Sequence, residues 1–138
     1  TVNGGSLQVL NGGSLTQGSS SAGDFLLGES GPGLLRVDGG GTLSTRFTVI
    51  GSLASGAGNA VLAGSGSTWT TRAGFVVGFD GKGALVVSNG ALLTNQSSAT
   101  LAFSRGSEGS VTLTGSGTTW SFAPSQFLTV GLRGEGTL

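Results

Sequence analysis

The sequence contains no cysteine and no histidine, and only two of its 138 residues are proline. Without cysteine there is no disulfide framework and no thiolate metal site, and without histidine the commonest metal ligand and general base is missing. We therefore expect neither a metal site nor a cofactor. Charge is also scarce, since six basic and six acidic residues give a formal net charge of zero with no run of either sign. Nucleic acid and anionic membrane surfaces are disfavoured as partners.

Long hydrophobic runs are absent as well. Apolar clusters such as FLL at Phe25–Leu27 are too short for a signal peptide or a spanning helix, so we expect no membrane insertion by this segment. Glycine, in contrast, is abundant at 29 residues, and it disfavours helices. Because 36% of the residues are hydrophobic, the chain is not a disordered Gly/Ser linker. We therefore expect a core assembled from many short strands.

The chain repeats itself with a period of about 50 residues. The sequence FLLG at Phe25–Gly28 recurs as FVVG at Phe75–Gly78, and GSGSTW at Gly64–Trp69 recurs as GSGTTW at Gly115–Trp120. The repeat units are roughly residues 25–74 and 75–126, and residues 127–138 together with 1–24 form a partial or compressed unit. Each unit divides again, because a short apolar strand followed by a Gly/Ser-rich turn returns about every 25 residues.

Three short strands per ~25 residues predict an all-β fold, a right-handed parallel β-helix (β-solenoid) of about five to six coils. A propeller would need longer antiparallel strands, and a hairpin array would show two-residue Asn-Gly turns. Stacked coils place equivalent side chains in ladders about 4.8 Å apart. The residues expected in the inward ladders are Leu27, Leu35, Val37, Ile50, Val61, Val77, Leu85, Val87, Leu113 and Leu128.

Sharp corners between the strands require residues that adopt positive φ, and glycine or asparagine does so at least cost. Asn-Gly-Gly at residues 3–5 and 11–13, Asp-Gly-Gly at 38–40 and Asn-Gly at 89–90 are expected at one equivalent corner. The corner residues predicted in this way are Gly4, Gly12, Gly39, Asn89 and Gly90.

This pattern resembles the glycine-rich β-helix repeats of bacterial autotransporter passenger domains and of PEP-CTERM-type surface proteins. The residues that carry the resemblance are the V-G of Val77–Gly78, the turn at Gly81–Gly83, the strand Leu85–Val87, the turn at Asn89–Gly90 and the GSGTTW at Gly115–Trp120. The resemblance covers essentially the whole chain. It implies a β-helical passenger or stalk that is exported and displayed outside the cell.

Charged residues gather mainly in the turn after the repeated strand. We expect a solvated charge ladder at this corner, formed by Glu29, Asp80, Lys82, Arg105, Glu108, Arg133 and Glu135. β-Helices that cleave acidic polysaccharides instead cluster acids and bases on one face, because proton abstraction needs paired groups. The sparse charges favour a protein that is not an enzyme and has no catalytic residues.

Trp69 and Trp120 are expected on the same side of the solenoid, two coils apart. If exposed, the two rings would contact a sugar or an apolar partner, and they are our candidate ligand contacts. Their recurrence at the same position of every second coil favours packing instead.

Three further binding functions are weaker hypotheses. Threonine-rich stretches at Thr68–Thr71, Thr112–Thr114 and Thr118–Thr119 are compatible with ice binding, but their spacing is irregular from coil to coil, which disfavours it. Calcium binding is disfavoured because only Asp38 and Asp80 come near the required glycine-aspartate pattern. The glycine clusters also lack the Gly-Lys-Ser/Thr ending and the following helix of a phosphate loop.

The two ends of the chain complete one another's motif. When the C-terminal residues are written before the N-terminal ones, Leu138 takes the place of Leu85 and Val2 the place of Val87 without a gap. We therefore expect one period of a longer array, continued covalently or by head-to-tail stacking of copies through unpaired strand edges.

Together these patterns predict an extracellular structural or adhesive stalk or filament segment at a bacterial cell surface. Its expected partners are copies of itself end to end, and surface glycans or host and cell-surface molecules. The alternative is a polysaccharide-binding or polysaccharide-processing β-helix.

Overall fold

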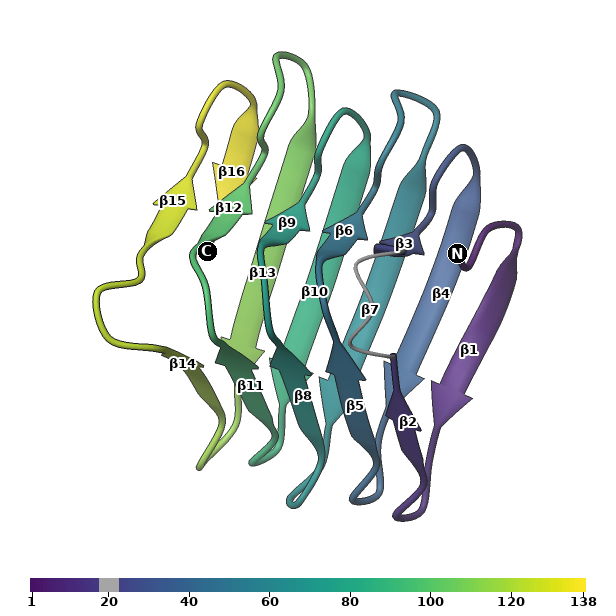
Figure 1. Ribbon diagram of the computed structural model, residues 1–138, viewed down its shortest axis with the longest axis vertical. Coiled ribbons are helices and arrows are strands. Elements are labelled where there is room, and N and C mark those ends of the chain that lie inside the picture. The colour runs from purple at the N-terminus through teal and green to yellow at the C-terminus, as the bar shows by residue number, and fades with distance from the viewer. Residues whose placement is uncertain (18–22) are drawn as a thin grey trace.

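A computed structural model describes residues 1–17 and 23–138, and every regular element in these ranges is a β-strand. The strands form three parallel sheets, stacked as a β-solenoid of about five turns with ~26 residues per turn. Each coil passes from sheet 1 to sheet 2 to sheet 3, so neighbours in a sheet belong to successive coils (Figure 1). The all-β solenoid expected from the repeat is confirmed.

Sheet 1 has six strands and holds the longest ones. They are β1 (Gly5–Val9), β4 (Pro32–Val37), β7 (Ala57–Ala63), β10 (Lys82–Ser88), β13 (Glu108–Thr114) and β16 (Glu135–Thr137). Sheet 2 has five strands, β2 (Ser14–Thr16), β5 (Thr42–Thr45), β8 (Thr68–Thr71), β11 (Leu92–Asn95) and β14 (Thr119–Phe122). Sheet 3 also has five, β3 (Phe25–Leu27), β6 (Thr48–Ile50), β9 (Phe75–Val77), β12 (Ala99–Leu101) and β15 (Leu128–Val130).

The core is the column of side chains enclosed by the three sheets. Strand alternation sends every second residue inward, as in β4, where Gly33, Leu35 and Val37 are buried and the residues between them are exposed. Most of the predicted inward residues are confirmed as buried: Leu27, Leu35, Val37, Ile50, Val77, Leu85 and Val87.

One predicted core position is wrong, and a second, at the end of the solenoid, is inward but not covered. Val61 points outward from β7, and its neighbours Ala60 and Leu62 fill the core instead. Three apolar residues in a row carry no alternation, so the sequence could not fix which of them faced inward.

Leu113 is in register with buried Val87 but is 38% exposed. The reason is that β16, the strand beside it, ends before reaching this position.

Every second coil carries a large aromatic residue in sheet 2, which explains the repeat of about 50 residues. Trp69 and Trp120 occupy the same inward position of β8 and β14, and leucine occupies it in β2, β5 and β11. Each indole N–H donates to the preceding coil, Trp69 Nε1 to Thr45 Oγ1 at 3.0 Å and Trp120 Nε1 to Asn95 Oδ1 at 2.9 Å. Coils with tryptophan at this position therefore alternate with coils that have leucine there.

The aromatic rings form a zigzag along the core between sheets 2 and 3. Successive ring centroids lie 6.3, 5.4, 6.2 and 5.1 Å apart, from Phe25 through Trp69, Phe75 and Trp120 to Phe122. The first three contacts are edge-to-face, an arrangement that adds to the stabilisation from burial. Phe75 lies in register with the smaller Thr48 and Ala99, so large and small residues alternate along sheet 3.

Four of the predicted corner residues lie between sheets 1 and 2 and have positive φ. The values are 74° at Gly12, 60° at Gly39, 56° at Asn89 and 80° at Gly90. Adjacent corners are also joined by hydrogen bonds, since the Gly40 amide donates to Ser67 Oγ at 3.0 Å. The predicted conformation of these turns is therefore confirmed.

Gly4 also has positive φ, at 68°, but its predicted place in the fold is wrong. Val2 bridges to Leu27 of sheet 3 and Gly5 begins β1 of sheet 1, so Gly4 lies at the corner between sheets 3 and 1. Val2 thus takes the place of a residue that ends a sheet 3 strand, not that of Val87 in sheet 1. The expected junction between the two chain ends fails at Val2 for this reason.

Candidate functional site

The outer face of sheet 1 holds a shallow depression of about 360 Å³. It lies across the first residues of four neighbouring strands, β7, β10, β13 and β16, where small side chains leave the backbone exposed. The residues that line it are Ala57, Gly58, Asn59, Lys82, Gly83, Ala84, Glu108, Gly109, Ser110, Glu135 and Thr137.

Inward glycines run along the sheet beneath the depression, because the corner between sheets 3 and 1 closes tightly over them. A Cβ at Gly83 would lie 2.5 Å from both Gly78 N and Ile50 O, so no larger residue fits there. Gly58 and Gly109 stand in register with Gly83 in the adjacent strands. This column of glycines is what lets the chain turn directly from sheet 3 into sheet 1.

The charged groups of the depression are stacked in one column of sheet 1. Lys82, Glu108 and Glu135 occupy the same position in successive strands, and Lys82 Nζ lies 2.7 Å from Glu108 Oε1. The hydrogen bond that Lys82 donates to Glu108 raises the pKa of Lys82 above its ordinary value of 10.5, and the negative charge of Glu108 adds to the effect. The contribution of this ion pair to the stability of the fold is present below the ordinary pKa of lysine and is lost as the pH rises through the raised pKa of Lys82. It is small, because both side chains are more than half exposed.

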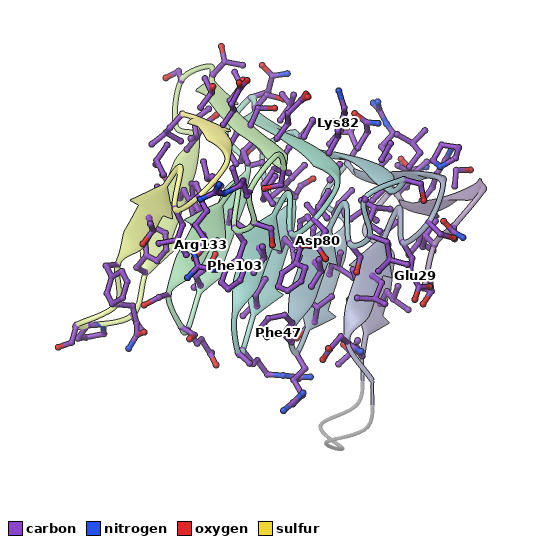
Figure 2. All side chains as sticks on the ribbon, turned by 90° about the horizontal axis from the view of Figure 1, so that it is seen from above. Glu29, Phe47, Asp80, Lys82, Phe103 and Arg133 are labelled. Carbon is purple, nitrogen blue, oxygen red and sulfur yellow. The ribbon has the colours of Figure 1, made fainter. Side chains whose placement is uncertain are left out.

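The remaining members of the predicted charge ladder do not pair. Within residues 1–17 and 23–138, Glu29, Asp80, Arg105 and Arg133 form no ion pair, and the other salt bridges join Arg36 to Asp38 and Arg46 to Asp24. Figure 2 shows Glu29, Asp80 and Arg133 spread along the corner, with Phe103 between Asp80 and Arg133. Phe103 stacks on Phe79 with ring centroids 4.9 Å apart. In place of the predicted charge ladder, the structure has one ion pair, between Lys82 and Glu108, and a stack of Phe79 on Phe103 at the corner.

The two tryptophans are packing residues. Trp69 is fully buried, so its predicted role as a ligand contact is wrong. Trp120 is partly buried and packs against the core of the last full coil. The shared position in alternate coils, which favoured packing in the sequence, is explained by the stacking of the aromatic rings described above.

The outer face of sheet 1 offers exposed polar and charged groups for contact with a ligand. Glu108 and Lys82 are half-exposed and paired with each other, and Glu135 is also exposed. A general acid or base needs a desolvated environment that tunes its proton affinity, and an enclosed space for substrate. Asn59, Ser110 and Thr137 add hydrogen-bonding groups to the depression. These groups match the hydroxyls of a glycan.

Sequence reasoning missed a second surface, the outer face of sheet 2. The threonine-rich stretches are irregular along the sequence because the corners differ in length, yet the strands align them in register: Thr42 with Thr68, and Ser44 with Thr70. The stretches named from the sequence are divided between two sheets, since Thr112 and Thr114 lie in β13 of sheet 1. Aligning the coils on the buried Leu or Trp of sheet 2, rather than on the threonines, would have found the pattern.

In the described part of the chain, no group of three or more acidic, histidine or cysteine side chains could hold a metal ion. No helix there is long and apolar enough to cross a membrane. Neither a protein family, nor a curated protein, nor a solved structure matches this sequence or fold.

Proposed function

We propose that this chain is a segment of an extracellular stalk or filament of a bacterial surface protein, which extends by end-to-end stacking of coils. The proposal rests on the solenoid and on the state of its terminal coils. Among the described residues, the sheet edges formed by β1 and β2 at one end, and by β14, β15 and β16 at the other, have no partner strand, and the edge of β3 carries only the single bridge from Val2 to Leu27. Unpaired parallel edges are templates for further strands.

Apolar side chains at the last coil support the same proposal. Phe127 is 65% exposed, and Val130 and Leu138 are 43% and 62% exposed. Trp120 and Leu128 beside them are only partly covered by the core. A further coil of the same repeat type would bury these side chains, which are costly to leave in water.

The stacking is tested by sedimentation velocity of the 138-residue chain over a wide range of concentrations. We expect the sedimentation coefficient to rise with concentration, and Val130→Lys to shift the chain toward the monomer because it places a charge in the interface. Leu53→Lys is the matched control, since Leu53 is 48% exposed at a corner away from both ends. A wild-type chain that stays monomeric throughout, or equal effects of the two variants, would contradict the proposal.

Polysaccharide binding is the second candidate, and the depression on sheet 1 favours it. It would take neutral or weakly charged glycans through Asn59, Ser110 and Thr137, with Lys82 and the two carboxylates at its edge. A glycan array tests this, with Asn59→Ala expected to weaken any binding. We propose no catalysis there, because the charged groups are solvated and Glu108 is paired.

A further inference from the structure

The outer face of sheet 2 carries two columns of hydroxyl groups in register. Each strand contributes one residue on either side of its inward Leu or Trp, and all but one of these outward residues are serine or threonine. The first column is Ser14, Thr42, Thr68, Leu92 and Thr119, and the second is Thr16, Ser44, Thr70, Thr94 and Ser121. Strand geometry sets the spacing, about 4.8 Å along a column and about 6.6 Å between columns.

These hydroxyls are not saturated by one another. Thr68 Oγ1 lies 3.5 Å from Thr42 Oγ1, and Thr94 Oγ1 lies 3.3 Å from Ser121 Oγ, both at the weak end of O–H···O geometry. A hydroxyl offers one donor and two acceptor lone pairs. Each column therefore keeps hydrogen-bonding capacity for an external partner.

The array is also rigid. Threonine has a restricted χ1, and its Cβ here is fixed in a strand that pairs on both sides in β5, β8 and β11. The inward neighbours of Thr42, Thr68 and Thr94 are fully or almost fully buried. Little side-chain entropy is lost when such groups bind together, so many weak contacts can act at once.

The chemistry of the face limits its ligand. No charged residue lies on any strand of sheet 2 in the described ranges, although sheet 1 and the corners carry several. Arg72, directly after β8, extends to the edge of the second column, where its Nη1 lies 3.5 Å from Ser44 Oγ and its Nη2 donates to Gln17 O at 2.5 Å. The aromatic residues of sheet 2 are inward, so sugar rings have no exposed aromatic surface to stack on. Apart from Arg72 at its edge, the array is uncharged, so it favours a periodic ligand that can both donate and accept hydrogen bonds.

We propose that the outer face of sheet 2 binds the surface of ice. Water molecules in a crystal are already ordered, they donate and accept as hydroxyls do, and they present a lattice to which a rigid two-column array can bind at many points. The threonine methyl groups add apolar contacts between the hydroxyls. This activity goes beyond the proposed stalk and does not depend on it, because the face lies along the side of the solenoid and not at its ends.

The test measures thermal hysteresis and inhibition of ice recrystallisation with the whole 138-residue chain in buffered water. Thr70→Lys and Thr94→Lys each place a long charged side chain in the second column. Thr112→Lys is the matched control, because Thr112 is exposed on the outer face of sheet 1. Circular dichroism and the melting temperature establish that every variant is folded.

We expect the wild type and Thr112→Lys to slow ice growth equally, and each sheet 2 variant to need a roughly tenfold higher concentration for the same effect. The proposal is overturned if the folded wild type leaves ice growth unchanged, or if Thr112→Lys loses as much activity as Thr70→Lys. Binding of the wild type to cellulose or chitin without an effect on ice would also overturn it and assign the face to a polysaccharide. None of these results depends on whether the chain stacks end to end.

Discussion

At the scale of single residues, two buried threonines differ in whether their side-chain hydroxyls form hydrogen bonds. Thr45 Oγ1 lies 2.8 Å from Thr48 Oγ1 and accepts the Trp69 indole N–H at 3.0 Å. Thr71 occupies the same position one coil later, in β8, and its hydroxyl has no hydrogen-bond partner among the described residues. The side-chain nitrogen of its neighbour Asn95 has none either. Thr71 and Asn95 lie in register in the neighbouring strands β8 and β11.

These two threonines give opposite predictions for one substitution. Thr71→Val removes a buried hydroxyl that has no partner, so we expect the free energy of unfolding to rise by about 1 kcal/mol. Thr45→Val removes the acceptor of Trp69 and leaves its N–H unpaired, so we expect a loss of about 1–3 kcal/mol. Chemical denaturation of both variants measures the difference. Equal destabilisation would mean that the Thr71 hydroxyl has a partner in solution.

At the scale of the elements, the corner that follows each sheet 3 strand is the most constrained. Gly28, Gly51, Gly78 and Gly131 all have positive φ there, and alanine replaces glycine only at Ala102, with φ 56°. A Cβ on Gly78 would collide with the backbone of Glu108. Ala102 is fully buried and keeps its Cβ in a backbone conformation that disfavours it.

The positive φ at this corner predicts opposite effects of two substitutions on the stability of the fold. Ala102→Gly relieves the left-handed conformation, worth about 1–2 kcal/mol, against about 0.5–1 kcal/mol of added chain entropy in the unfolded state, so we expect unchanged or slightly higher stability. Gly78→Ala adds the same strain together with a backbone collision and should cost more than about 2 kcal/mol. Thermal unfolding compares them. A loss on Ala102→Gly as large as that on Gly78→Ala would refute this account of the corner.

The sequence allowed the elements to be placed more reliably than the faces of their side chains. Repetition of FLLG and of the GSGxTW segment was enough to predict strands, corners and stacking, because these depend on apolar clusters and glycines that recur. The face of Val61 could not be predicted, since Ala60 and Leu62 beside it are also apolar. Gly4 was assigned to the wrong corner because Asn-Gly-Gly occurs at two different corners, and only strand pairing distinguishes them.

The candidate surfaces show the same limit. Lys82 and Glu108 were predicted in one ladder and do form a pair. Asp80 and Arg133 were predicted in it too, but Phe79 and Phe103 stack between the charged positions of that corner. The hydroxyl columns of sheet 2 were not predicted because the corners differ in length. Residues that lie in register in the sheet are therefore unevenly spaced in the sequence.

At the scale of the whole molecule, the solenoid is uniform along its axis and ends in a step. Sheet 1 has six strands while sheets 2 and 3 have five, so the solenoid ends with β16, the first strand of a sixth coil, beside β13. A further coil must complete sheets 2 and 3 beside β16, and the step restricts the rotation at which it can do so. The exposed side chains of the last coil, Phe127 and Val130 among them, lie at this step.

The most direct test of end-to-end stacking is cryo-electron microscopy of the chain at high concentration, with X-ray diffraction from aligned samples. The account predicts rods one solenoid wide, of lengths well beyond a single chain, with a reflection at about 4.8 Å along the rod axis. Discrete particles one chain long at every concentration, or rods whose 4.8 Å spacing runs across the axis, would contradict it.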